Sequence, residues 1–407
     1  MSTEYIILII GYVLGFYMAW NIGANDVANS MATSVGSKAI TMRQAVFIAG
    51  ILNLIGATFI GEHVTDTIRN GIVSTQVLTD PKLALIGSLS AILAASLWIS
   101  FSTWKSLPIS TTHSIVGAMI GFGIMAGGFS IVQWGKLAGV AASWVISPVI
   151  SILISFFTFK AIVKWILNQE DPFNQALKLS PFIIGSAMFV VVLSFLFKTP
   201  LGKTLSLETG STIYVSAIVS VICGFIGKWL LGRHFRNHIT GAEDIFRRIQ
   251  VGTACYVALA QGANDVANAI GPLAVIYFLV KTGNIGAEVP IPIFLLFFGG
   301  IGIACGIWMA GGRVMETMGE KITSLTNTRG FSVELAAATT VLVASKMGLP
   351  VSTTHAAVGG VIGVGLAGGI DAINFGIVFK IVIYWLLTVP IAAITSAAIF
   401  KLLQLIL

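Results

Sequence analysis

Charged residues are scarce in this sequence. Asp, Glu, Lys and Arg together make up 10% of its 407 residues, whereas 56% are hydrophobic. Soluble domains carry about 25% charged residues, so this composition excludes an ordinary soluble domain. Segments such as 150–159, 182–197 and 291–306 are apolar on nearly every side. The chain is therefore predicted to be an all-α polytopic protein of the lipid bilayer.

Cysteines and features of a cleavable leader are also few. The three cysteines, Cys223, Cys255 and Cys305, stand singly in apolar stretches, in no spacing typical of a disulfide or a metal site. The start of the chain lacks a basic region and a small-residue cleavage site, so its apolar run is interpreted as the first membrane helix. The net charge of +7 comes from short loops, which favours a role in membrane orientation, and nucleic acid is not expected as a partner.

Apolar segments separated by polar breaks number about twelve. They cover residues 5–33, 44–60, 84–104, 109–127, 134–158, 181–197, 212–232, 251–280, 291–310, 334–347, 350–369 and 374–404. Segment 334–347 would be about 21 Å long as a helix, which is short for a hydrocarbon core of about 30 Å. We expect it to form a helical hairpin with 350–369, near the middle of the membrane. By the repeat described next, 84–104 and 109–127 form a second hairpin.

Two motifs occur twice, in the same order. The heptad GANDVAN at 23–29 returns at 262–268, and LPISTTHSIVG at 107–117 returns as LPVSTTHAAVG at 349–359. Two copies of a long unit in an apolar chain are typical of a transporter repeat. The sequence predicts a first repeat over 1–158, connecting helices and a cytoplasmic loop over 159–250, and a second repeat over 251–407.

Loop charges predict that the two repeats insert in opposite orientations. Loop 34–43 carries Lys38 and Arg43 without an acidic residue, whereas the equivalent loop 281–290 balances one lysine against one glutamate. The arginine-rich loop 233–248 is also interpreted as cytoplasmic. Counting the crossings then places both termini outside the cytoplasm, with the protein in the cell (inner or plasma) membrane.

The GANDVAN heptads place acid and amide groups inside membrane segments. Asn25 and Asn29 share one helix face, and Asp26 lies beside them. The second copy supplies Asn264, Asp265 and Asn268. An Asp at the bilayer centre costs about 2.5–3.5 kcal/mol, which a bound Na⁺ or a shared proton would offset. The plainer interpretation is that these residues cap half-helices and hold helices together, but duplication favours a binding site. The glycine permits a break or close packing, and we expect two inverted-topology repeats with broken helices that meet at the membrane midplane.

The second motif combines a proline with three hydroxyl residues and a histidine. A half-helix that starts at Pro108 would present unpaired N–H groups and its positive dipole end. The hydroxyls there are those of Ser110, Thr111 and Thr112, and the second copy supplies those of Ser352, Thr353 and Thr354. One such motif is an ordinary helix start, but two facing copies predict a site for a small tetrahedral anion.

Together the motifs indicate one combined site, in which Asn25 and Asn264 are candidates for contact with both phosphate and Na⁺. Anion donors without an arginine leave a phosphate dianion partly unneutralised, and adjacent Na⁺ would supply the missing charge, so that each ligand favours the other. Movement of the two halves about a central site would then give alternating access. His113 and His355 are weaker candidates for phosphate contact or proton relay, because a buried histidine with a backbone partner is more common. Glu334 is a candidate cation ligand or an interfacial helix-start residue.

With these motifs the chain resembles the inorganic phosphate transporter (PiT) family over essentially its whole length. The resemblance implies cation-coupled phosphate uptake, inverted repeats and about twelve membrane segments. It also implies functional positions at the residues of the two GANDVAN copies, the two Ser-Thr-Thr stretches and Glu334. The connecting loop is shorter than in the animal members, and Asn53 and Ser88 stand where some of these carry glutamates.

The leading interpretation is a Na⁺-coupled phosphate symporter, with Na⁺ as the coupling ion and H⁺ as the alternative. Metal phosphate and sulfate are alternative substrates. A passive anion channel is less favoured because the polar groups are clustered rather than continuous. An enzyme is not expected, since the sequence has no evident metal cluster or paired nucleophile and base. The expected partners are inorganic phosphate, Na⁺, the lipid bilayer and, as one oligomeric state, a second copy in a homodimer.

Overall fold

The computed structural model describes residues 3–61, 80–198, 208–235, 241–283, 291–346 and 351–406, and these form helices and short connections without any strand. The helices of the first half are α1 (Thr3–Gly36), α2 (Met42–Ile60), α5 (Pro81–Trp104), α6 (Thr111–Gly127) and α7 (Trp134–Ile162). α8 (Pro172–Lys198) and α10 (Thr209–His234) follow. The second half contains α11 (Ala242–Thr282), α12 (Ile293–Ala310), α13 (Gly312–Glu316), α14 (Asn327–Lys346), α15 (Thr353–Gly368) and α16 (Phe375–Ile406). Each predicted apolar segment overlaps one of these helices, which confirms the all-α polytopic class.

Local sequence explains where several helices begin. The Thr41 hydroxyl accepts from the Gln44 N–H, and the Gln44 side chain accepts from the Thr41 N–H, so a capping box starts α2. The Asp80 carboxylate accepts from the first N–H groups of α5, and Pro81 occupies the first helical position. Nine helices of the described residues are long and apolar enough to cross a membrane, and α6 and α15 are apolar but shorter.

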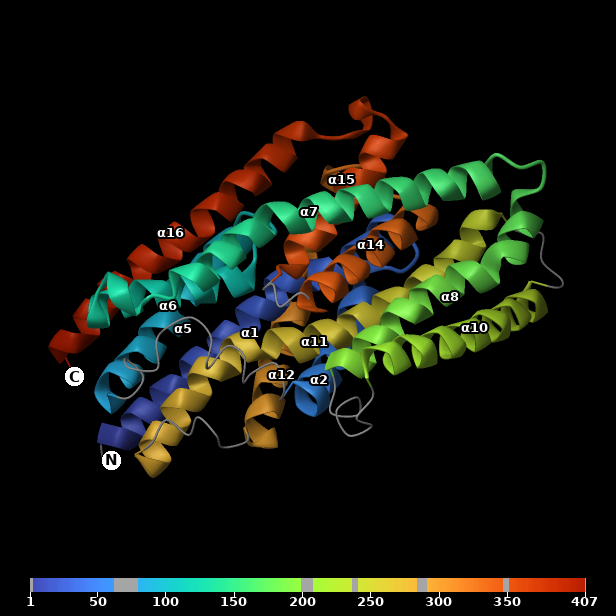
Figure 1. Cartoon of the computed structure of the whole chain (residues 1–407). Helices are drawn as coiled ribbons and strands as arrows, with labels where there is room; N and C mark the ends of the chain where they lie inside the picture. Colours follow the sequence, from blue (N-terminus) through green and yellow to red (C-terminus); the bar gives the residue numbers. More distant parts are fainter. Residues whose placement is uncertain are drawn as a thin grey trace.

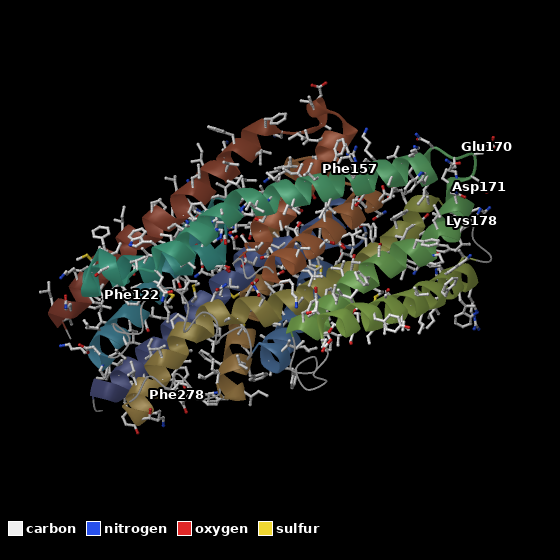
Figure 2. The ribbon with its side chains drawn as sticks, in the orientation of Figure 1. Phe122, Phe157, Glu170, Asp171, Lys178 and Phe278 are labelled. Atoms are coloured by element: carbon white, nitrogen blue, oxygen red, sulfur yellow. The ribbon has the colours of Figure 1, made fainter. Side chains whose placement is uncertain are left out.

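The chain ends and the charged turns lie at opposite ends of the molecule. Both termini lie at one end in Figure 1, while the α7–α8 turn lies at the other. Figure 2 places Glu170, Asp171 and Lys178 at that second end, and Phe157 of α7 projects from the outer surface between the ends. Phe157 is 63% exposed, as expected of a side chain that faces lipid. The equivalent loops 34–43 and 281–290 cannot be compared, because 284–290 lies outside the described residues.

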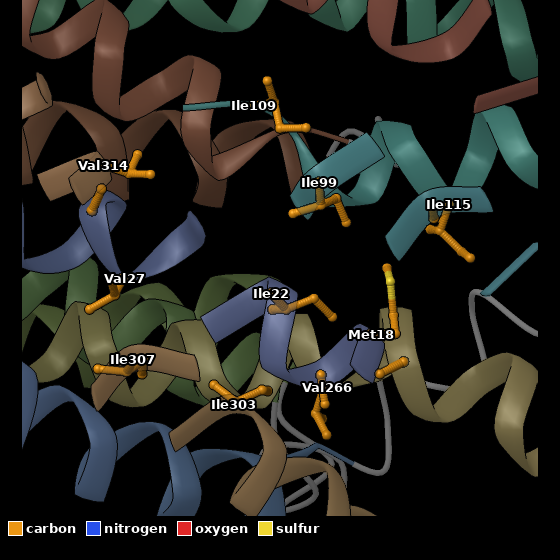
Figure 3. Close-up of a cluster of buried hydrophobic side chains, with 14 of the residues drawn as sticks. Met18, Ile22, Val27, Ile99, Ile109, Ile115, Val266, Ile303, Ile307 and Val314 are labelled. Atoms are coloured by element: carbon orange, nitrogen blue, oxygen red, sulfur yellow. The ribbon is translucent and has the colours of Figure 1, made fainter. Parts of the chain in front are cut away.

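The two halves of the chain are interleaved. A Cβ at Gly11 would meet Ile276 and one at Gly15 would meet Leu273, so α1 and α11 run antiparallel. α1 packs on α12 and α11 packs on α2, while α6 packs on α16 and α15 packs on α7. Each of these pairs joins a helix of the first half to a helix of the second. Figure 3 shows the resulting apolar core, in which Ile22 of α1 and Val266 of α11 lie near Ile303 of α12.

The interleaved packing contains matched close approaches. A Cβ at Gly23 would overlap the Ile303 carbonyl, and one at Gly262 would overlap the Asn53 carbonyl. Each is the single glycine of its GANDVAN copy, and small residues are what permits helix backbones in a membrane to touch. The paired contacts are those expected if the two halves are inverted repeats, which remains our proposal for this fold.

Three details of the sequence-based picture are wrong. The GANDVAN segments are not broken, because α1 and α11 continue through them and their glycines serve close packing. The segment expected at 334–347 belongs to a helix of 20 residues, Asn327–Lys346, because its polar first turns also fold as helix. α6 begins at Thr111 rather than at Pro108, because the Ser110 side chain caps it. In the second motif, Leu349 and Pro350 lie outside the described residues.

Candidate functional site

The first hairpin, α5–α6, is held against α1 by Asn25. The Ile109 N–H donates to Asn25 Oδ1 at 3.0 Å. Asn25 Nδ2 in turn donates to Thr103 Oγ1 at 2.9 Å and to the Leu107 carbonyl at 3.2 Å. Asn25 is 1% exposed, so it uses its donors and its acceptor inside the protein. The structure therefore places Asn25 beside the hydroxyl motif, where two of its three contacts are with main-chain atoms of the tip.

Asp26 and Asn29 of α1 contact both hydroxyl motifs. Thr111 Oγ1 donates to Asp26 Oδ2 at 2.5 Å, and Asn29 Nδ2 donates to Thr354 Oγ1 at 3.0 Å and to Thr353 Oγ1 at 3.3 Å. Residues more than 300 positions apart in the chain thus meet at one place. The Thr111 hydroxyl carries no net charge, so an ionised Asp26 would need a cation beside it, and without one the buried carboxyl would hold a proton.

The second heptad joins the same centre from α11. Asn268 Nδ2 donates to Thr112 Oγ1 at 3.2 Å, and Asn264 Nδ2 donates to the neighbouring Asp265 Oδ1 at 3.0 Å. Thr354 Oγ1 donates to the Ile109 carbonyl at 3.1 Å, which links the two hydroxyl motifs directly. The structure therefore brings together the acidic and hydroxyl residues that the sequence predicted to cooperate.

The helix starts at the centre have unpaired donors. Ser110 Oγ accepts from the His113 N–H and Ser352 Oγ accepts from the His355 N–H, each at 3.2 Å. The two serines are thus N-caps through their oxygen atoms, and each keeps its hydroxyl proton for another acceptor. The first-turn N–H groups of Thr111 and Thr112 have no partner within α6, as at every helix start. Such groups, at the positive end of a helix dipole, are suited to bind an anion.

Three buried side-chain oxygens at the centre have no hydrogen-bond partner among the described residues. They are Asp26 Oδ1, Asn29 Oδ1 and Asn268 Oδ1. Buried polar atoms are normally satisfied, so each of these oxygens requires an explanation. Carboxylate and amide oxygens are what hard cations accept as ligands, and the residues present therefore fit a small cation.

Glu334 belongs to a separate polar cluster. Thr33 Oγ1 and Ser34 Oγ donate to Glu334 Oε1 at 2.7 and 3.3 Å, and Thr253 Oγ1 donates to Glu334 Oε2. Thr33 lies seven residues beyond Asp26, about 10 Å along α1 at the helix rise. The structure does not bring Glu334 to the Asp26 centre.

His113 and His355 pack against aromatic rings. Their imidazoles make an edge-to-face contact with centroids 5.0 Å apart. His355 stacks on Trp385 at 3.8 Å, and His113 lies 5.4 Å from Trp144. This environment is that of core histidines, and the predicted roles in phosphate contact or proton relay gain no support from it.

Several polar residues of the site were missed from the sequence. Thr33 lies four residues after Asn29, so the continued polar face of α1 was a usable signal. Thr103 ends α5 next to the tip, and no pattern singles it out. Thr253, on α11, is one of many isolated threonines, and only its contact with Glu334 identifies it.

A cavity of about 110 Å³ opens beside the centre. It lies against the first half of α11 and reaches Asn264, Asn29 and Thr353, with largely apolar walls from α8 and α14. Its lining is Asn29, Ile60, Ser194, Phe195, Tyr256, Val257, Leu259, Ala260, Gln261, Ala263, Asn264, Ala337, Ala338, Val341 and Thr353. The site is therefore approached from the side on which α11 begins.

Comparison with known proteins agrees with this arrangement. The model of the phosphate transporter family matches residues 22–396. The chain belongs to this family. That match contains both copies of each motif described above.

Relatives in this family are similar over nearly the whole chain. A protein of Thermococcus kodakarensis named as a phosphate permease is 51% identical over 402 residues, covering 98% of both chains. The chloroplastic inorganic phosphate transporter 2-1 of Arabidopsis thaliana is 42% identical, covering 95% of this chain and 70% of its own. A solved structure described as the sodium-dependent phosphate transporter is 46% identical, with a TM-score of 0.88, covering 98% of this chain and 100% of that one. This chain thus shares its fold with that solved structure over nearly its whole length.

Proposed function

We propose that this protein is a secondary transporter that carries inorganic phosphate together with Na⁺. The observation that carries the proposal is the meeting of Asp26, Asn29 and Asn268 with the hydroxyls of both tips, where three buried oxygens have no hydrogen-bond partner. The family match and the sodium-dependent solved relative support the same assignment. An enzymatic activity is not part of the proposal.

In this proposal the anion and the cations occupy adjacent parts of one centre. Phosphate is held by the first-turn N–H groups of α6 and α15 and by the hydroxyls of Ser110, Thr112, Ser352 and Thr353. The Thr111 and Thr354 hydroxyls donate to Asp26 and to the Ile109 carbonyl, and they join the phosphate site when those bonds are released. Na⁺ is held by oxygens of Asp26, Asn29 and Asn268, with their neighbours Asn25, Asn264 and Asp265. Na⁺ offsets the negative charge of phosphate and of the acidic side chains, and phosphate offsets the positive charge of Na⁺. Binding of either ligand therefore favours binding of the other, as symport requires. Glu334 is a ligand of a second, separate cation site.

Alternating access must act on the interleaved fold. Because α1 packs on α12 and α11 on α2, the sequence halves 1–158 and 251–407 are not separate bodies. The movement therefore separates groups of helices drawn from both halves, which replaces the simpler idea of one half rocking against the other. In this scheme both termini are extracytoplasmic, in the cell (inner or plasma) membrane, and the cavity beside α11 is cytoplasmic. A homodimer remains the proposed assembly.

Uptake of radiolabelled phosphate into proteoliposomes of the purified protein tests the function. We expect uptake with an inward Na⁺ gradient and little uptake when choline replaces Na⁺. Equal uptake driven by a pH gradient without Na⁺ would instead establish the alternative, in which H⁺ on Asp26 or Asp265 is the coupling ion. That alternative is specific because the buried Asp26 carboxyl has no cationic side chain among its hydrogen-bond partners in the described part of the chain, and a proton would neutralise it as a cation would. Electrical conductance far above carrier turnover would favour a channel.

A further inference from the structure

A ring of hydrogen bonds joins α1 to α5 away from the proposed binding centre. Ser100 Oγ donates to Asn21 Oδ1 at 2.6 Å, and Asn21 Nδ2 donates to the Tyr17 carbonyl at 2.8 Å. Tyr17 Oη and Ser100 Oγ lie 2.5 Å apart. A serine hydroxyl has one proton, which Asn21 receives, so Tyr17 is the donor to Ser100. Asn21 is fully buried, and the ring satisfies all three side chains.

The position of this ring relates it to access. α1 starts at the end of the molecule where both termini lie (Figure 1). Asn21 precedes Asn25 by one helical turn, so the ring lies between the centre and that end. It joins the same two helices that the bond from Asn25 to Thr103 joins at 2.9 Å. A path from the termini side to Asp26 between α1 and α5 must pass the ring.

The equivalent positions of the second half cannot form such a ring of hydrogen bonds. The heptads are offset by 239 positions (262 − 23) and the tip motifs by 242 (349 − 107). Tyr17, Asn21 and Ser100 therefore correspond to Tyr256, Ala260 and Leu342. Tyr256 and Ala260 line the cavity, and the Tyr256 hydroxyl donates to the Val191 carbonyl on α8 instead. Ala260 and Leu342 carry no polar side-chain atom, so the ring cannot form there.

We infer that Tyr17, Asn21 and Ser100 form a polar lock that keeps the termini side of the binding centre closed, and that the opposite side has no equivalent lock. The inference rests on the proposed transport function for its role, while its geometry stands on the contacts above. Because an unpaired hydroxyl or amide is costly in an apolar interface, the ring holds α1 on α5 until water or movement replaces its bonds. The unlocked side then opens more readily, in keeping with the cavity beside α11.

Side-specific labelling of a buried position tests the lock. In a background with Cys223, Cys255 and Cys305 replaced by alanine, Thr103→Cys places a thiol on α5 one turn beyond Ser100, on the centre side of the ring, where Thr103 is buried beside Asn25. Ala338→Cys places a thiol in the cavity on the opposite side. A membrane-impermeant thiol reagent is applied separately to each face of proteoliposomes. We expect the Ala338→Cys thiol to react from the face opposite the termini, and the Thr103→Cys thiol to react slowly from the termini face.

Breaking the ring should change only one of these rates. Adding Ser100→Ala removes two hydrogen bonds of the ring, and we expect about a tenfold faster reaction of the Thr103→Cys thiol from the termini face alone. Tyr17→Phe, which removes one hydrogen bond and keeps the packing of the aromatic side chain, should give a smaller increase. Ser100→Thr, which keeps the hydroxyl, should restore slow labelling. Tyr256→Phe is the matched control and should leave the Thr103→Cys rate unchanged.

The outcomes separate the lock from the transport function. An unchanged Thr103→Cys rate in the Ser100→Ala and Tyr17→Phe variants overturns the lock, even where phosphate uptake is normal. An equal increase from both faces also overturns it, because that result means general loosening. A one-sided increase supports the lock even if uptake does not depend on Na⁺, since labelling requires no coupling ion.

Discussion

The two copies of the heptad GANDVAN differ in their surroundings. In the first copy Asn25 is buried and makes three hydrogen bonds to the α5–α6 hairpin, whereas in the second copy Asn264 is half-buried, lines the cavity and bonds its neighbour Asp265. Because the heptads are identical, the difference cannot come from the motif. The difference comes from the helices around each copy. The centre is closed on the side of Asn25 and open to the cavity on the side of Asn264.

The packing of the two heptads, by contrast, is the same. Gly23 lies on the main chain of Ile303, and Gly262 lies on that of Asn53. A second pair of close helix contacts also repeats: Gly306 lies against the main chain of Trp20, and Gly56 lies against that of Leu259. The frame formed by α1, α2, α11 and α12 is thus symmetric, and the asymmetry is confined to where the hairpins meet it.

Neutralising Asp26 or Asp265 should have the largest effect on phosphate uptake. The effect should be similar for both residues, although the surroundings of the two heptads differ. Asp26→Asn and Asp265→Asn keep the side-chain shape but lose the charge that is proposed to hold Na⁺. We expect each to reduce Na⁺-driven phosphate uptake by at least about 100-fold, since a lost charge contact with a bound ion costs several kcal/mol. Asp371→Asn, at an exposed turn, is the control and should transport normally. Normal uptake in one of the two site variants would mean that its heptad holds no coupling ion.

Adding a methyl group to the symmetric frame should have the next largest effect. Gly23→Ala and Gly262→Ala each push a Cβ into a main-chain carbonyl, which cannot rotate away. We expect each to destabilise the protein by about 3 kcal/mol, and the two losses to be equal. Unfolding in detergent with increasing dodecyl sulfate measures them. The control is Gly139→Ala, which has open space around it. Clearly unequal losses of unfolding free energy would show that the two glycine contacts are not equivalent in the protein.

The pattern of the sequence predicts much of this site but not its asymmetry. Asn25, Asp26 and Thr111 could be grouped because repeated polar residues in membrane segments require partners. The start of α6 was misplaced at Pro108, because Pro-Ile-Ser offers two plausible helix starts and only the Ser110 bond to the His113 N–H decides between them. The continuity of α1 and α11 was missed because glycine permits both a break and close packing. Which tip is closed could not be predicted from identical heptads; it depends on distant residues such as Ser100 and Leu342.

Removing the amide of each copy should reveal the asymmetry. Asn25→Ala removes three hydrogen bonds and leaves the Ile109 N–H buried without its partner. We expect a loss of about 2–3 kcal/mol in the free energy of unfolding. Asn264→Ala, at a half-exposed position with one bond, should cost less than about 1 kcal/mol. The same dodecyl sulfate titration measures both. Equal costs would indicate that the protein in solution closes both tips to the same extent, contrary to the contacts described.

The smallest expected effect concerns the tryptophans behind the two tips. Trp385 Nε1 donates to the Pro108 carbonyl at 3.0 Å, whereas Trp144 Nε1 has no hydrogen-bond partner among the described residues. Trp385→Phe should therefore cost about 1 kcal/mol more than Trp144→Phe, the worth of one buried hydrogen bond beyond the shared loss of ring area. Both variants lose buried indole area, and this loss largely cancels in the difference between their unfolding free energies. The pair is therefore more informative than either variant alone. If Trp144→Phe is as costly as Trp385→Phe, the Pro108 contact does not fix the first tip, and the closed side must be held by Asn25 and the α1–α5 ring alone.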